Sequence, residues 1–138
     1  MTCIETLKNN KNLMLIKYLI MMIAVQVIYI MLSSMIPQME QAEYIISFDR
    51  IIISVLTVFA EEFLFRYLII GKIGRYSKLS FITSSLLFAL MHTDISNLVL
   101  YFIAGMIIGK LYEDTKDIKY PIILHLLNNF LVIIMTNF

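Results

Sequence analysis

The chain has 138 residues, enough for one domain, and 60% of them are hydrophobic whereas only 15% are charged. Soluble domains average about 25% charged residues, so this composition, with a mean hydropathy of +0.85, excludes an ordinary soluble protein and predicts an all-α polytopic membrane protein. The net charge of +1 indicates no nucleic-acid partner, and the single cysteine, Cys3, excludes an intramolecular disulfide and a cysteine-based metal site.

Five apolar segments predict a bundle of about five transmembrane helices in a lipid bilayer. A polar stretch, residues 1–12, precedes them and is predicted to be a short cytoplasmic tail. The first segment is long enough to span a bilayer, which takes about 20 residues. The third is short for a full span. The five segments are residues 13–36, 51–70, 79–92, 97–112 and 121–138.

The placement of lysine and arginine predicts the orientation of these helices. With five spans, nine of the eleven basic residues fall on one side, whereas Arg50 falls on the other and Arg66 lies within a span. Cytoplasmic loops carry the excess of positive charge. The N-terminus is therefore predicted to lie in the cytoplasm and the C-terminus outside the cell membrane.

Several residues predict local structure in the second half of the chain. Asp94 or Ser96 can cap the helix that follows, and Pro121 suits the first turn of the last helix. Gly105 and Gly109 form a Gly-x-x-x-Gly pattern, which lets another helix approach closely.

Three ionisable side chains lie in the middle of the second apolar segment. Each such group costs roughly 2.5–3.5 kcal/mol at the centre of a spanning helix, and such groups are candidates for a functional site. Glu62 and Arg66 are four residues apart, so they share a helix face and can form an ion pair. Glu61 is left without an obvious partner on its own helix.

Two further segments carry polar pairs with the same spacing of four residues. The third segment has Phe88 and His92, and the last has His125 and Asn129, with Asn128 close to the same face. These are the only histidines of the chain. Polar groups on three apolar helices are unfavourable unless they contact one another or water, so we expect Glu61, Glu62, His92, His125 and Asn129 to share a pocket.

Each of these pairs also has a purely structural interpretation. Glu62 and Arg66 can be a structural ion pair, and His125 with Asn129 can supply hydrogen bonds between helices. Phe88 can serve packing, with an effect on the orientation of His92. Taken together, however, a carboxylate, two imidazoles and an amide in one apolar bundle favour hydrolysis. A carboxylate can take a proton from water, and an imidazole or an amide can donate to the oxyanion that develops.

In their order on separate helices, these residues resemble a known family. Glu61-Glu62-x-x-x-Arg66, Phe88-x-x-x-His92 and His125-x-x-x-Asn129 are similar to the motifs of the CAAX-protease and bacteriocin-processing (CPBP, or Abi) intramembrane proteases. The motifs span about half the chain. The resemblance implies that residues 51–138 are the catalytic helical core.

The resemblance also implies a role for each residue. Glu61 would activate the water and His92 would help to hold it, while His125 and Asn129 would form the oxyanion hole. Glu62 and Arg66 would support the site. Metal dependence stays open, because Glu61, His92 and His125 could bind Zn²⁺ with one open position, whereas the chain has no His-Glu-x-x-His motif.

The resulting hypothesis is a bacterial intramembrane endopeptidase that acts on a membrane-associated peptide or protein. Peptide processing and self-immunity against a bacteriocin are the settings that the resemblance implies. A chain this short could act as a homo-oligomer. The alternative is a non-enzymatic immunity or partner-binding membrane protein that uses the same polar residues as structural contacts. A small ion or proton carrier ranks below both.

Overall fold

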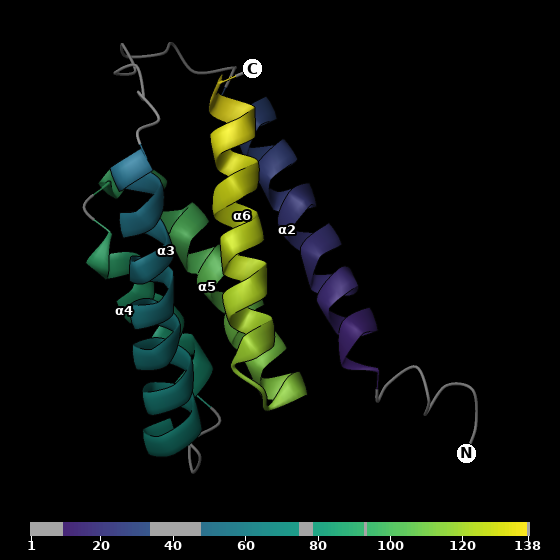
Figure 1. Cartoon of the computed structure of the whole chain (residues 1–138), viewed down its shortest axis with the longest axis vertical. Helices are drawn as coiled ribbons and strands as arrows, with labels where there is room; N and C mark the ends of the chain where they lie inside the picture. Colours follow the sequence, from purple (N-terminus) through teal and green to yellow (C-terminus); the bar gives the residue numbers. More distant parts are fainter. Residues whose placement is uncertain (1–9, 34–47, 75–78, 93, 138) are drawn as a thin grey trace.

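The computed structural model describes residues 10–33, 48–74, 79–92 and 94–137, and all regular elements in these ranges are helical (Figure 1). The all-α fold expected from composition is therefore confirmed. The elements are α2 (Lys11–Ser33), α3 (Phe48–Glu62), the π-helix η1 (Phe63–Ile73), α4 (Ser80–Met91), the 3₁₀ turn η3 (Ile95–Asn97), α5 (Leu98–Thr115) and α6 (Lys119–Asn137).

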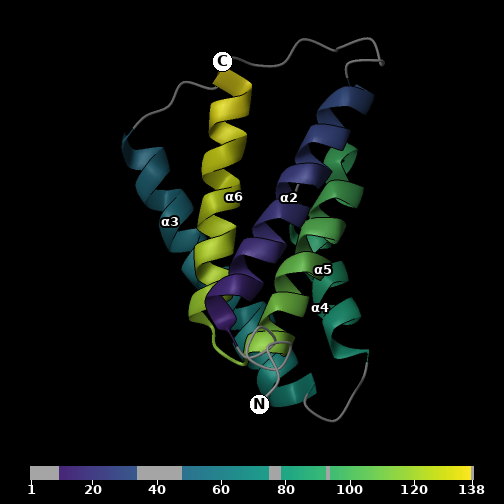
Figure 2. The same cartoon turned by 90° about the vertical axis from the view of Figure 1, so that its right-hand side faces the viewer.

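The helices run alternately up and down, and η1 continues α3 without a break (Figures 1 and 2). The start of α2, the end of η1 and the α5–α6 connection all lie at the lower end of both views. The sequence places most of its lysines at these ends. The arrangement agrees with the predicted asymmetry of charge, whereas the side that faces the cytoplasm stays a prediction.

Two stretches of the described chain, Lys11–Leu32 and Ile95–Thr115, are long and apolar enough to cross a membrane. The apolar helices Ser80–Met91 and Lys119–Met135 are shorter. Large apolar side chains are exposed along α2, among them Ile20 and Met31, as a lipid-facing surface requires. The arrangement with five spans stays a prediction, because α4 is short and the α3–η1 rod carries three ionisable groups in its middle.

Several predicted helix boundaries differ from the structure: α3 begins at Phe48 rather than residue 51, α5 ends at Thr115 rather than residue 112, and α6 begins at Lys119 rather than residue 121. The first helix begins at Lys11 rather than residue 13, because Asn10 Oδ1 accepts hydrogen bonds from the backbone N–H groups of Asn12 (3.1 Å) and Leu13 (3.3 Å). The second helix continues to Ile73 through π-helical winding, past its predicted end at residue 70. Residues 1–9, with Cys3, and residues 34–47 lie outside the described ranges.

The hydrophobic core lies where α2, α5 and α6 meet. It is built from Tyr18 and Met22 of α2, Leu124 of α6 and four side chains of α5, namely Ala104, Ile107, Ile108 and Leu111. Burial of these side chains fixes α2 against the other helices. Asp94 caps the 3₁₀ turn η3, since its side chain accepts from the backbone N–H of Ser96, whereas Asn97, the N-cap of α5, makes no side-chain cap hydrogen bond. The buried Pro121 lies in the first turn of α6, as predicted.

Small residues bring α4 and α5 close together, as the Gly-x-x-x-Gly pattern predicted. A Cβ atom added at Gly105 would lie 3.2 Å from Ser85 Cα and 3.2 Å from Phe88 Cδ1. At Gly109 the nearest atom would be Ile70 Cδ1 at 3.4 Å, an ordinary contact. Gly105 is therefore the position at which close approach depends on the absence of a side chain.

Replacing Gly105 by alanine should destabilise the bundle by about 1–3 kcal/mol, the usual range for overpacking a core. The added methyl group would push on the Ser85 backbone, which cannot move without moving α4. Gly109→Ala is the matched control and should be tolerated. Thermal unfolding of the detergent-solubilised variants measures both effects, and equal melting temperatures for the two would contradict the prediction.

Candidate active site

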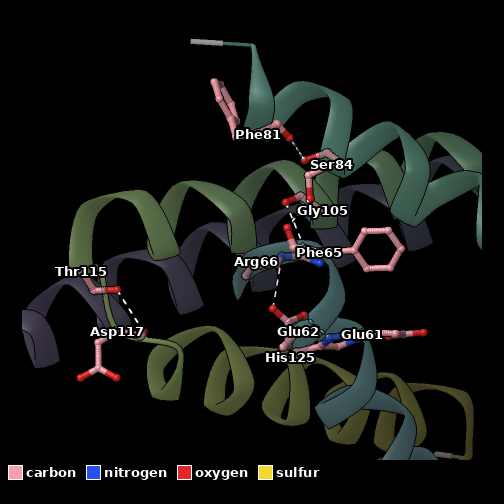
Figure 3. A network of polar contacts seen from close by, with 11 residues as sticks. Glu61, Glu62, Phe65, Arg66, Phe81, Ser84, Gly105, Thr115, Asp117 and His125 are labelled. Atoms are coloured by element: carbon pink, nitrogen blue, oxygen red, sulfur yellow. Dashed lines mark hydrogen bonds and ion pairs between the residues drawn. The ribbon is translucent and has the colours of Figure 1, made fainter. Parts of the chain in front are cut away.

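The acidic pair lies at the point where α3 becomes π-helical, since Glu62 is the last residue of α3 and Phe63 the first of η1. Short π-helical segments often occur at functional sites because they break the regular i→i−4 bonding. A side chain from α4 bonds to this stretch, since Ser84 Oγ donates to the Phe65 carbonyl at 2.8 Å (Figure 3). This hydrogen bond ties the backbone of η1, just after the acidic pair, to α4.

Glu62 and Arg66 form the ion pair that their spacing predicted. Arg66 Nε lies 3.2 Å from Glu62 Oε2, and both side chains are completely buried (Figure 3). Arg66 Nη2 also donates to the Gly105 carbonyl at 3.3 Å, and its guanidinium carbon lies 4.8 Å from the centroid of the Phe88 ring. These contacts link η1 to α4 and α5.

His125 lies between the two carboxylates (Figure 3). Its Nδ1 lies 2.8 Å from Glu62 Oε1, and its Nε2 lies 3.7 Å from Glu61 Oε2. An ionised carboxylate only accepts hydrogen bonds, so Nδ1 donates to Glu62 and Nε2 is the nitrogen directed toward Glu61. A histidine of α6 is therefore oriented by one acidic residue and faces the other.

The two acidic side chains differ in their exposure. Glu62 is fully buried, hydrogen-bonded to His125 and ion-paired with Arg66, whereas the side chain of Glu61 is 16% exposed. Glu61 is therefore the carboxylate that water and a substrate can reach. Glu62 is the one that holds other side chains in place.

His92 is the C-cap residue of α4, and its ring is held from two sides. Nδ1 lies 2.8 Å from the Phe88 carbonyl, which can only accept, so Nδ1 donates and Nε2 of the neutral ring is an acceptor. The ring stacks on Tyr101 with 4.0 Å between centroids. Phe88 contacts the rings of His92 (4.7 Å) and His125 (5.6 Å) and so lies between them. His92 is also within electrostatic range of Glu61.

The two asparagines of α6 face different helices. Asn129 Nδ2 donates to Ser54 Oγ on α3 over 3.4 Å, a long and weak hydrogen bond. Asn128 is buried and accepts a hydrogen bond from Gln26 of α2. Asn129 thus shares the α3–α6 contact with His125, whereas Asn128 belongs to the contact with α2.

Three residues in this region did not emerge from the sequence as parts of a site: Ser54, Tyr101 and Gln26. A serine and a tyrosine in apolar helices give no signal, because each is common as a packing residue. Gln26 interrupts the first apolar segment, and a buried amide there signals a partner on another helix.

The residues named for zinc do not form a metal site in this geometry. Within the described ranges, no three His, Cys, Asp or Glu side chains are arranged to hold a metal ion. The Nδ1 contacts of His125 with Glu62 and of His92 with the Phe88 carbonyl do not bear on this result, because metal-ligating histidines commonly make the same contacts. The sequence leaves a zinc-dependent and a metal-free reaction as alternatives, and the reaction proposed below uses only side chains of the protein.

An apolar helical bundle with a buried carboxylate–imidazole cluster defines a membrane protein with the groups needed for hydrolysis. The family model described as "Type II CAAX prenyl endopeptidase Rce1-like" matches residues 45–131, which include all three motifs. The chain belongs to this family of membrane CAAX proteases. The resemblance indicated by the motifs is thereby confirmed.

Two curated bacterial proteins are similar to the same part of the chain. The "Putative membrane peptidase YdiL" of Bacillus subtilis (strain 168) is 37% identical over 89 residues, which cover 62% of this chain and 36% of that protein. The "Membrane-embedded CAAX protease MroQ" of Staphylococcus aureus (strain USA300) is 37% identical over 90 residues, covering 59% and 36%. The chain thus spans about a third of the length of these relatives. No solved structure matches it.

Proposed function

We propose that the protein is an intramembrane endopeptidase that hydrolyses a peptide bond in a membrane-associated peptide or protein. The observation that carries the proposal is the position of His125 between the fully buried carboxylate of Glu62 and the partly exposed carboxylate of Glu61. A purely structural ion pair needs neither the histidine nor the second acid. Family membership supports the same reaction class.

In the proposed reaction, Glu61 is the general base. It takes a proton from a water molecule, whose oxygen then adds to the carbonyl carbon of the substrate and leaves a negative charge on the carbonyl oxygen. His92, with Nδ1 donating to the Phe88 carbonyl, offers Nε2 as an acceptor that helps to orient this water. When the C–N bond breaks, the proton held by Glu61 passes to the leaving amine.

His125 and Asn129 are the proposed donors to the oxyanion. Glu62 accepts from His125 Nδ1 and thereby orients the ring, so that Nε2 can donate to the oxyanion when both ring nitrogens carry a proton. Arg66 holds the Glu62 carboxylate in place through their 3.2 Å contact. The bond from Asn129 to Ser54 is long at 3.4 Å, so this amide can turn to a developing charge at little cost.

The substrate is proposed to be a peptide or a protein segment at the membrane, because the site lies within apolar helices. One relative is named a membrane-embedded CAAX protease and the other a putative membrane peptidase, both from bacteria. For this chain, we propose peptide processing or self-immunity against a bacteriocin as the biological setting. We propose that the protein acts at the cell membrane as a homo-oligomer. Prenylated CAAX substrates are not expected in such a setting.

Cleavage of candidate membrane peptides by the purified protein, with and without a metal chelator, tests the proposal. We expect cleavage in both cases, because the histidines and Glu61 do not converge as metal ligands. Loss of activity with chelator and its return with Zn²⁺ would contradict the metal-independent reaction. A protein that protects cells but cleaves no peptide, including those from its own genomic neighbourhood, would favour the non-enzymatic alternative.

A further inference from the structure

One buried amide contacts α6 beside the candidate site, from a helix outside the matched family region. Gln26 lies on α2, whereas the family match covers residues 45–131. Its side chain is 5% exposed, and its Nε2 donates to Asn128 Oδ1 of α6 at 3.0 Å. An amide in an apolar segment is unfavourable without a partner, and this one has its partner next to Asn129.

Two adjacent faces of α6 contact different helices. Leu124 and Asn128 point to the core shared with α2 and α5 and to Gln26. His125 and Asn129, each one residue further on, point to Glu61, Glu62 and Ser54 of α3. Neighbouring residues of an α-helix differ by about 100° in direction. The rotation of α6 about its axis therefore fixes both sets of contacts together.

The contact with Gln26 is suited to set this rotation. Apolar packing of Leu124 is non-directional, so it resists separation of the helices more than rotation. A hydrogen bond at 3.0 Å depends on distance and angle. It also adjoins Asn129, whose own bond to Ser54 is long at 3.4 Å and holds the amide loosely.

We infer that Gln26 is a positioning residue for the oxyanion donors His125 and Asn129, and that it acts through Asn128. The inference rests on the proposed function, because it concerns the same site. It assigns α2 a part in the reaction beyond anchoring the bundle. Gln26 does not touch the reacting atoms.

The test compares Gln26→Leu with variants that keep or restore the bond. Gln26→Leu should lower kcat about ten- to hundredfold with little change in KM, because oxyanion donors displaced by a fraction of an ångström stabilise the transition state less. Gln26→Asn and Asn128→Gln should each impair the rate. The double variant Gln26→Asn/Asn128→Gln exchanges the two side-chain lengths and should recover most of it.

Tyr18→Phe is the matched control on the same helix. Tyr18 donates to Asp114 of α5 at 2.5 Å, so this variant removes an α2 contact without touching α6. It should keep the kcat of the unaltered protein. If Tyr18→Phe slows the enzyme as much as Gln26→Leu, or if Gln26→Leu keeps full kcat, α2 acts only as packing and the inference is wrong.

A cross-linking measurement separates this inference from the proposed function. Cysteines placed at 54 and 129, in a Cys3→Ser background, replace side chains whose polar atoms lie 3.4 Å apart. Gln26→Leu should slow formation of the disulfide, and Tyr18→Phe should not. This result would support the positioning role even if the protein cleaves no peptide, whereas unchanged cross-linking in Gln26→Leu would overturn it.

Discussion

Replacing Glu61 by glutamine should reduce kcat/KM for peptide hydrolysis by about three orders of magnitude, within the range that a general base supplies. The amide has almost the same shape but cannot take a proton from water. The fold should remain intact, because Glu61 is partly exposed and Arg66 is neutralised by Glu62 instead. The measurement is cleavage of a membrane peptide by equal amounts of purified protein, together with its melting temperature.

Glu113→Gln is a suitable control for this experiment. Glu113 is an acidic residue near the end of α5, paired with Lys110 on the surface and remote from the site in sequence. It should cleave like the unaltered protein. His125→Ala should lose activity as Glu61→Gln does. If Glu61→Gln and His125→Ala both keep full biological activity at equal expression, hydrolysis is not the function, and the polar cluster serves binding or structure.

Spacing along one helix was the part of the site that the sequence could predict well. Glu62 and Arg66 are four apart and do pair. The Gly-x-x-x-Gly pattern identified the close approach at Gly105 because small residues act locally, at the position where they stand. Such inferences need only the geometry of one helix.

Contacts between helices depend on where each helix begins, which the sequence leaves open. Counted at 1.5 Å per residue, His92 lies about 18 Å from the start of α4, whereas His125 lies only about 9 Å from the start of α6. The two imidazoles nevertheless contact the same ring, Phe88. Phe88 lies one helical turn before His92 on α4, and its ring bridges part of this difference by contacting both imidazoles.

The π-helical winding from Phe63 to Ile73 was also beyond prediction. Tertiary contacts act on this stretch, among them the hydrogen bond from the Ser84 hydroxyl to the Phe65 carbonyl and that from the Arg66 guanidinium to the Gly105 carbonyl. No residue type in this stretch indicates it. The contact of His125 Nδ1 with Glu62 was likewise beyond prediction, because it depends on the rotation of α6 about its axis.

The second large effect concerns stability, because Arg66 is the buried counter-charge of Glu62. Arg66→Met should destabilise the protein by about 3–5 kcal/mol, the usual cost of removing one partner of a buried ion pair. Both side chains are fully buried, so water cannot take the place of the guanidinium. Methionine keeps much of the packing against Phe88, and the loss therefore reports mainly the uncompensated carboxylate. Denaturant unfolding in detergent measures it.

The double variant Glu62→Gln/Arg66→Met distinguishes a charge effect from a packing effect. Glutamine at 62 keeps an oxygen that can accept from His125 Nδ1, while no buried charge is left alone. The double variant should therefore be more stable than Arg66→Met, although it lacks more of the native contacts. If its loss of stability equals the sum of the losses measured for Glu62→Gln and Arg66→Met alone, the contacts of Arg66 with Gly105 and Phe88 dominate and the ion pair contributes little. Its remaining activity would show how far the charge of Glu62, beyond its hydrogen bond, is needed for His125 to act.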